Sequence, residues 1–160
     1  MFDWRETVND TQSASETNNA LSVSTLTQHS CAPQTILLVE DEAFVREMIC
    51  EILEGAGYRV LKARNAVEAK SAFRRFGKIV QLLLADVILP GQNGRELARD
   101  LRGINSALRV ICISGYSLNL VTQKRLVEGG VFFLPKPFSS ESLLRKVRQV
   151  LAKDLEELAI

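Results

Sequence analysis

The sequence predicts an α/β protein built on a five-stranded parallel sheet with helices on both faces. Five short apolar runs alternate with segments in which apolar residues recur at helical spacing. Glycine, asparagine and serine mark the ends of these segments, as they do at turns and helix caps. Strands and helices that alternate in this way form parallel sheets, because each helix carries the chain back to the edge where the next strand begins.

The composition is that of a soluble globular chain with one domain. The 160 residues are 46% hydrophobic and 24% charged, and the formal net charge is +1. A charge this small gives no electrostatic basis for binding nucleic acid or a membrane. The apolar runs are too short to span a bilayer and the first residues lack the features of a signal peptide, so we expect a cytoplasmic protein.

Three regions differ in composition. Residues 1–34 are polar and lack apolar periodicity, so we expect a disordered N-terminal tail before a folded domain at residues 35–153. Residues 154–160 continue the apolar spacing of the last helix and are expected to extend it. The only histidine, His29, lies in the tail, which excludes a histidine-based active site in the folded part.

The three cysteines predict no special chemistry. Cys31, Cys50 and Cys112 are odd in number and widely spaced, which fits neither a disulfide framework nor a metal site. Cys50 and Cys112 lie in apolar periodic segments and are expected to be buried.

The five strands are short and most are continuously apolar, as expected of strands buried on both faces. They are expected at Thr35–Val39, Tyr58–Leu61, Leu82–Asp86, Leu108–Ile113 and Val131–Leu134, with the second more exposed than the others.

Five helices follow these strands. In the first, Phe44, Met48 and Ile52 recur every four residues, with Val45, Ile49 and Leu53 beside them on the face expected to be buried. Asn65, Ser117 and Ser139 are expected to cap the second, fourth and fifth helices, and Asn93-Gly94 leads into the third. The last helix has an apolar stripe of Leu143, Leu144, Val147, Val150 and Leu151.

Polar residues stand where four of the strands end. Glu40 and Asp41 follow the first strand, Asp86 ends the third, Ser114 follows the fourth and Lys136 lies just beyond the fifth. The carboxyl ends of parallel strands share one edge of the sheet, so we expect these side chains to converge in one crevice. Each feature alone is as ordinary as a helix cap or a turn. Their joint occurrence at four strand ends indicates a site.

Three carboxylates in one crevice repel each other unless a cation lies among them. Oxygen ligands without histidine or cysteine favour a hard ion, and Mg²⁺ is the natural choice. With the metal present, Asp86 can act as a nucleophile toward a phosphoryl group and form an acyl phosphate. Lys136 can then pair with one phosphoryl oxygen while Ser114 donates a hydrogen bond to another.

Four stretches resemble the response regulator receiver domain, the CheY-like phosphoacceptor module of two-component phosphorelay signalling. They are Ile36–Glu42, Asp86 with Leu89-Pro90-Gly91 and Gly94, Ile113–Tyr116, and Leu134–Phe138, in order within residues 35–153. The resemblance implies a flavodoxin-like, doubly wound sheet of strand order 2-1-3-4-5 with five helices. Gly94–Ala98 and Leu134–Phe138 also resemble receivers of hybrid histidine kinases.

The resemblance also implies roles for the residues at the sheet edge. Asp86 would be phosphorylated by a cognate histidine kinase or phosphotransfer protein, with Lys136 binding the phosphoryl group. Asp41 would bind Mg²⁺ directly and Glu40 through water, and Asp86 and the backbone carbonyl of Ile88 would complete the protein ligands.

Signal output follows from the same resemblance. Ser114 and Phe133 would form a switch pair that changes the surface of the fourth helix, fifth strand and fifth helix, where a downstream protein partner binds. Lys136-Pro137 would be a cis peptide bond. The chain would assist its own phosphorylation and dephosphorylation and would not otherwise be an enzyme. After the last helix we expect no output domain, and the extended helix offers a surface for a homodimer.

Departures from the family pattern are few. Glu40 and Phe133 stand where aspartate and tyrosine are common. Ile88 lies two residues after Asp86, and Tyr116 lies two residues after Ser114. In the family that this chain resembles, residues at these two positions influence the lifetime of the phosphate. Both are bulky, so we expect them to shield the acyl phosphate from water and to slow its hydrolysis.

Particular residues argue against three alternative classes of protein, and a fourth alternative stays open. A Mg²⁺-dependent phosphatase-like enzyme with an aspartyl phosphate would want a second acid two residues after the nucleophile, where this chain has Ile88. A pseudo-receiver would have lost the acids that this chain keeps. A dinucleotide-binding fold would want a glycine-rich turn where Glu40-Asp41-Glu42 stands. A receiver excised from a hybrid histidine kinase stays open.

Overall fold

The structure of this protein is a computed structural model that describes residues 32–115 and 130–152. Four expectations fall on residues outside this part of the chain. They are the N-terminal tail up to residue 31, the shielding of the phosphate by Tyr116, the helix that Ser117 was expected to cap, and the helix extension at residues 154–160.

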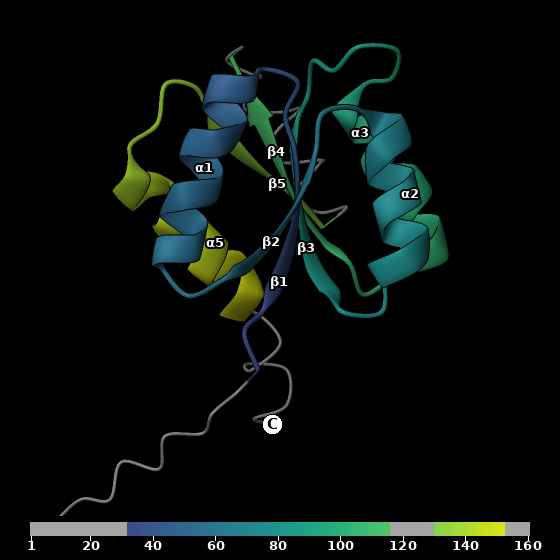
Figure 1. The fold of residues 1–160 in the computed structure, drawn as a ribbon, viewed down its shortest axis with the longest axis horizontal. Coiled ribbons are helices and arrows are strands. Elements are labelled where there is room, and N and C mark those ends of the chain that lie inside the picture. Colours follow the sequence, from purple (N-terminus) through teal and green to yellow (C-terminus); the bar gives the residue numbers. More distant parts are fainter. Residues whose placement is uncertain (1–31, 116–129, 153–160) are drawn as a thin grey trace, which may run out of the picture. The chain divides into compact units, whose positions relative to one another are not determined.

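Strands and helices alternate along the described chain from β1 to β4, and β5 and α5 follow after residues 116–129 (Figure 1). In order they are β1 (Thr35–Val39), α1 (Ala43–Gly55), β2 (Arg59–Ala63), α2 (Ala66–Phe76), β3 (Val80–Asp86), α3 (Gly94–Ile104), β4 (Arg109–Ser114), β5 (Val131–Pro135) and α5 (Ser140–Ala152). All pairings are parallel and the strand order is β2-β1-β3-β4-β5. The predicted fold class and strand order are therefore confirmed.

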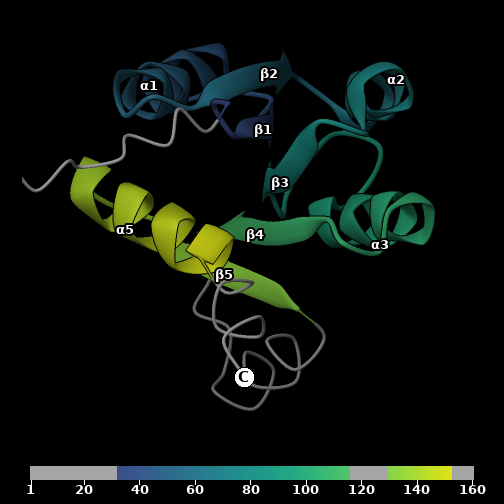
Figure 2. The ribbon, with the colours of Figure 1, turned by 90° about the horizontal axis from the view of Figure 1, so that it is seen from below.

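Helices cover both faces of the sheet. Seen from the end of the sheet, α1 and α5 lie on one side and α2 and α3 on the other (Figure 2). Successive residues of β1 serve opposite faces: Ile36 and Leu38 pack toward α1 and α5, whereas Leu37 and Val39 pack toward α2 and α3. This is why β1, β3 and β4 have no polar alternation, since both faces of these strands are covered, whereas β2 at the edge of the sheet is partly exposed.

The expected helix caps inside the described chain are present. The side-chain oxygen of Asn65 accepts a hydrogen bond from Glu68 N at 2.9 Å, and that of Asn93 accepts one from Arg95 N at 2.8 Å. Ser139 Oγ accepts from Ser142 N at 3.1 Å. These bonds fix where α2, α3 and α5 begin, because each satisfies an amide of the first turn that has no partner within the helix.

The expected buried face of α1 is wrong at two positions. Phe44 is 77% exposed and Met48 is 40% exposed, whereas Ile49 and Leu53 are fully buried and Cys50 is nearly so. Apolar residues of α1 cover a wider arc than the sheet can bury, and the helix settles on the stripe that runs through Ile49 and Leu53. Phe44 and Met48 lie to one side of that stripe and face outward.

The two cysteines of the described chain are buried, as expected. Burial raises the pKa of the Cys112 thiol to about 12, so it stays protonated and unreactive at neutral pH. Within the described chain, no helix has the length and apolar character needed to cross a membrane.

Candidate functional site

The sheet itself positions the predicted site residues. Asp86 is the last residue of β3 and lies in register with Ile113 of β4, whose carbonyl accepts a hydrogen bond from Val87 N at 2.8 Å. One strand further along, Lys136 N donates to the carbonyl of Ser114 at 2.8 Å. The backbone pairing thus continues past the ends of the strands and brings Asp86, Ser114 and Lys136 to one edge of the sheet.

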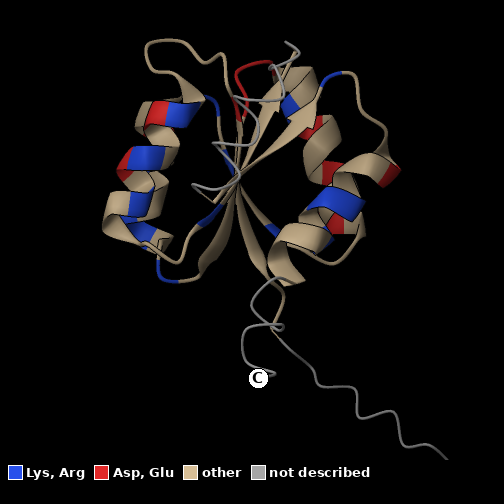
Figure 3. Ribbon diagram, turned by 180° about the vertical axis from the view of Figure 1, so that it is seen from behind, with Lys and Arg blue, Asp and Glu red and all other residues tan. Residues whose placement is uncertain are grey.

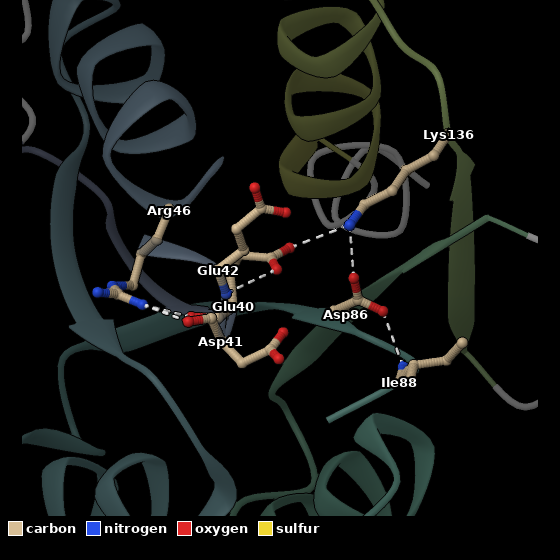
Figure 4. A network of polar contacts seen from close by, with 7 residues as sticks. All are labelled: Glu40, Asp41, Glu42, Arg46, Asp86, Ile88 and Lys136. Atoms are coloured by element: carbon tan, nitrogen blue, oxygen red, sulfur yellow. Dashed lines mark hydrogen bonds and ion pairs between the residues drawn. The ribbon is translucent and has the colours of Figure 1, made fainter. Parts of the chain in front are cut away.

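Lys136 bridges the two buried carboxylates of this edge (Figure 4). Its Nζ lies 2.5 Å from Asp86 Oδ2 and 3.2 Å from Glu40 Oε2. Glu40 is 1% exposed and Asp86 is 7% exposed. One ammonium therefore lies between two carboxylates that have little access to water. Each carboxylate gains a favourable contact, but one positive charge balances only one of the two negative charges.

The remaining oxygens of these carboxylates accept backbone hydrogen bonds. Asp86 Oδ1 accepts from Ile88 N at 2.7 Å, and Glu40 Oε1 accepts from Glu42 N at 3.3 Å. Each of the four carboxylate oxygens thus has a donor, which orients both side chains.

The pKa values show how the charges of this cluster interact. Burial raises the pKa of Glu40, the charge and hydrogen bond of Lys136 oppose that rise, and the nearby charge of Asp86 adds to it. Burial alone lowers the pKa of Lys136, but its hydrogen bonds and the charges of Asp86 and Glu40 outweigh burial and raise the pKa above its ordinary value. Lys136 is therefore a stable cation, while Glu40 remains short of positive charge.

Asp41 lies at the same edge but faces solvent. Its side chain is exposed and forms no ion pair or hydrogen bond with a described residue. Glu40, Asp41 and Glu42 follow one another directly after β1, and Figure 3 shows an acidic loop at the edge of the sheet. In this arrangement no three acidic, histidine or cysteine side chains among residues 32–115 and 130–152 lie close enough to hold a metal ion.

The donor chemistry nevertheless fits a hard divalent cation. Glu40, Asp41 and Asp86 supply only oxygen; two of these carboxylates share the ammonium of Lys136, and the third, that of Asp41, has no ion pair with a described residue. An excess of negative charge on oxygen ligands, without sulfur or imidazole, is the setting that Mg²⁺ prefers.

The predicted switch pair occupies neighbouring strands. Ser114 ends β4 and is 5% exposed. Phe133 lies in β5, is half-buried, and packs against the apolar cluster on the α2 and α3 side. The Arg95 guanidinium of α3 lies 6.0 Å from the centre of the Phe133 ring, a contact that the sequence did not indicate. The Lys136-Pro137 peptide bond is cis, as expected.

Arg46 of α1 is a further residue that sequence reasoning missed. Its Nη1 donates to the backbone carbonyls of Glu40 at 2.7 Å and of Asp41 at 3.2 Å (Figure 4). These bonds hold the loop from which both acids project. The sequence did show a basic residue in the first turn of the helix that follows the acidic run. That spacing does not identify a contact, because it is also common on helices whose charged side chains face solvent.

Gly94 is required by the close approach of the chain to Asp86. A Cβ at this position would lie 2.0 Å from the carbonyl oxygen of Asp86, and Gly94 N donates to the carbonyl of Val87 at 3.0 Å. Gly91 supports the same turn with φ of +80°, a conformation that glycine adopts without strain. The loop after β3 thus folds back directly onto the site.

Comparison with known proteins agrees with this arrangement. The sequence pattern of the family described as "Response regulator receiver domain" matches residues 36–148. The chain is 35% identical over 119 residues to the sensor kinase CckA of Brucella abortus (strain 2308), and this match covers 74% of this chain and 13% of that protein. It is 35% identical over 124 residues to the phosphate regulon transcriptional regulatory protein PhoB of Pseudomonas aeruginosa, covering 75% of this chain and 52% of that protein.

The solved structures include the receiver domain of the hybrid histidine kinase CckA. It is 37% identical to this chain, with a TM-score of 0.63, and the match covers 73% of this chain and 98% of that one. The chain therefore spans a small part of one curated relative and about half of another, but nearly the whole of a solved receiver domain. The protein belongs to the response regulator receiver domain family of two-component signalling, with likeness to the receivers of hybrid histidine kinases.

Proposed function

We propose that Asp86 accepts a phosphoryl group from a phosphohistidine of a cognate kinase or phosphotransfer protein. The observation that carries this proposal is the contact of Lys136 with the buried carboxylates of Asp86 and Glu40. A carboxylate at the end of a central strand, held beside a fixed cation, is oriented to attack an electrophile that carries negative charge.

The proposed step is a displacement at phosphorus. An Asp86 carboxylate oxygen forms a bond to phosphorus as the phosphorus–nitrogen bond of the donor breaks, and the donor imidazole leaves with the electron pair. Lys136 then transfers its hydrogen bond from Asp86 Oδ2 to an oxygen of the phosphoryl group, where negative charge is greatest. The product is an acyl phosphate on Asp86, and its hydrolysis restores the carboxylate.

The residues that would hold Mg²⁺ are Glu40, Asp41, Asp86 and the backbone carbonyl of Ile88. A bound Mg²⁺ neutralises charge on the phosphoryl oxygens and so lowers the repulsion between donor and acceptor. In support, Arg46 fixes the carbonyls of Glu40 and Asp41, and the surplus of carboxylates over ammonium leaves this edge in need of a cation. The exposed Asp41 carboxylate is available as a ligand.

Phosphorylation would be read through Ser114 and Phe133. Ser114 would donate a hydrogen bond to the phosphoryl group, and the Phe133 ring would move toward the space that Ser114 leaves, changing its contact with Arg95. The surface affected includes β5 and α5; α5 carries Arg145, Lys146 and Arg148, and the first two line a pocket together with Phe133 and Leu134 of β5. A downstream protein partner that binds this surface would distinguish the two states.

The test is incubation of the full chain with Mg²⁺ and acetyl phosphate, read by intact-protein mass. We expect one phosphoryl group to be added, and none in Asp86→Asn or when a chelator replaces the metal. Glu54→Gln is the matched control, because this exposed carboxylate lies in the last turn of α1, next to the start of β2 and away from the strand ends that carry Asp86. Addition that persists in Asp86→Asn, or that is lost in Glu54→Gln alone, would refute the assignment.

A further inference from the structure

A groove lies at the end of the molecule opposite Asp86, where the strands begin. It has a volume of about 580 Å³ and is lined by residues 73–79 at the end of α2 and the turn into β3, and by Ile104 and Asn105 at the end of α3. Because β3 starts here and ends at Asp86, the full length of that strand separates the groove from the phosphoacceptor.

The groove exposes apolar side chains that a monomer would be expected to cover. Phe76 is 37% exposed, Ile79 is 44% exposed and Ile104 is 69% exposed. They are three of the seven large apolar side chains that are exposed within the described residues: Phe76 ends α2, Ile79 lies in the turn before β3, and Ile104 ends α3. Gathered apolar exposure of this kind marks a surface that binds another molecule.

The rim of the groove is cationic. Arg74, Arg75 and Lys78 line it, all three are exposed, and no acidic residue is among the lining residues. None of the three forms an ion pair with another described residue. The Arg75 guanidinium lies 5.0 Å from the centre of the Phe76 ring, so one cation already rests on the apolar floor. Figure 3 shows basic segments at this end of α2 and in the turn that follows it.

We propose that this groove binds an acidic amphipathic segment of a partner protein. Leucine-like side chains of the segment would enter the groove over Phe76, Ile79 and Ile104, while its carboxylates pair with Arg74, Arg75 and Lys78. Charge complementarity selects an acidic partner, and the apolar floor selects one that also carries aliphatic side chains.

The shape and composition of the groove favour this occupant over two others. A bilayer is bound by apolar side chains that protrude from a surface, whereas these line a concave one. Single-stranded nucleic acid is bound by several aromatic rings on which successive bases stack, whereas the one exposed ring among the lining residues, Phe76, already carries Arg75, and Ile79 and Ile104 are aliphatic. Since the groove and Asp86 lie at opposite ends of β3, a segment bound here leaves the phosphoacceptor accessible, and the proposal does not depend on phosphorylation.

The test is binding of a labelled peptide to the full chain, measured by fluorescence anisotropy. The probe is a synthetic peptide with two repeats of Glu-Leu-Glu-Glu-Leu-Leu-Glu, and its counterpart has Lys in place of every Glu. We expect the acidic peptide to bind about tenfold or more tightly than the basic one, and added salt to weaken it. Arg74→Glu with Arg75→Glu and Lys78→Glu should abolish binding, and Ile104→Ser should weaken it at least severalfold.

The matched control is Arg59→Glu with Lys62→Glu and Arg99→Glu, three exposed cations outside the groove and outside the site, which changes the net charge equally. It should leave peptide binding unchanged. Equal loss in both triple variants would show attraction to net charge alone and overturn the proposal. Absence of binding by the acidic peptide would overturn it too, as would tighter binding of anionic vesicles that the groove variant abolishes.

Discussion

At the scale of single residues, the site depends on one ammonium between two carboxylates. Lys136 contacts Asp86 and Glu40, whose side chains are 10% and 2% exposed, while its own side chain is 31% exposed. Removing it leaves two poorly solvated negative charges without a counter-charge, which costs far more than the loss of a surface ion pair. The same contact orients Asp86, so Lys136 contributes both to stability and to the proposed chemistry.

Lys136→Ala is therefore expected to destabilise the fold at neutral pH by about 2 kcal/mol, a value reduced from that of a fully buried pair because Lys136 is partly solvated. The loss should shrink in acid, where Glu40 becomes protonated. Urea unfolding at the two pH values measures it. The matched control is Lys62→Ala, which removes an exposed pair with Glu47 and should change stability far less. Equal effects of the two substitutions would contradict the account.

Glu40 gives the stability a defined pH dependence. Its pKa is raised in the folded chain above the ordinary 4.5, so the folded state holds this proton more tightly than the unfolded state. The resulting stabilisation is fully present below 4.5 and is lost as pH rises through the raised pKa. Relative to Glu40→Gln, the native chain should therefore lose unfolding free energy as pH rises from 4.5 toward neutral. A difference between the two that stays constant, or rises with pH, would be inconsistent with a raised pKa.

Ile88 is expected to govern how long the phosphate lasts. Its amide binds Asp86 Oδ1 while its side chain is 60% exposed beside the site. If that side chain shields the acyl phosphate, Ile88→Asn should speed hydrolysis severalfold, as followed by phosphate release after the donor is removed. Ile104→Asn, at a similarly exposed residue of the opposite end, should not. An unchanged rate in Ile88→Asn would remove this role.

At the scale of elements, the ends of the strands and the starts of the helices carry the function. The loop between β3 and α3 turns back so closely that Gly94 touches the Asp86 carbonyl. Asn93 caps the first turn of α3. The loop after β1 is held by Arg46 in a comparable way. In both loops, backbone carbonyls next to the acids are held by close contacts, and this limits how the acids can move.

Substituting alanine for each of two glycines in α3 distinguishes the effect of this close approach from the effect of helix propensity. Gly94→Ala forces a Cβ against backbone that cannot yield, so it should destabilise the fold by about 2 kcal/mol and reduce phosphorylation of Asp86. Gly103→Ala meets nothing within 4 Å and should stabilise the same helix by about 0.5 kcal/mol. Thermal unfolding of both variants decides this, and stabilisation by Gly94→Ala would contradict the close approach.

At the scale of the whole molecule, two surfaces lie at opposite ends of one sheet. The acidic edge carries Asp86, and the far edge carries the basic and apolar groove around Phe76. A central strand links them, and its apolar residues Leu82, Leu83 and Leu84 are fully buried. With the two proposed functions placed in this way, one end would receive a phosphoryl group while the other binds a partner.

Much of this could be predicted from the sequence, since buried strands and capped helices leave local patterns. Asn65 and the apolar run before Asp86 are examples, and the resemblance to receivers supplied the strand order. Contacts between distant segments could not be predicted in the same way. Arg46 and the pairing of Lys136 with Glu40 depend on how elements meet, and the exposure of Phe44 depends on which of two adjacent helical stripes the sheet can bury.

Asp86 is proposed to carry the phosphate, and peptide mapping shows whether it does. The full chain is treated with Mg²⁺ and acetyl phosphate, the acyl phosphate is reduced with borohydride, and the peptides are mapped by mass spectrometry. Reduction converts a phosphorylated aspartate into homoserine, so we expect homoserine at position 86 and unmodified Glu40 and Asp41. Homoserine at Asp41, a reduced side chain at Glu40, or no conversion at Asp86 would contradict it.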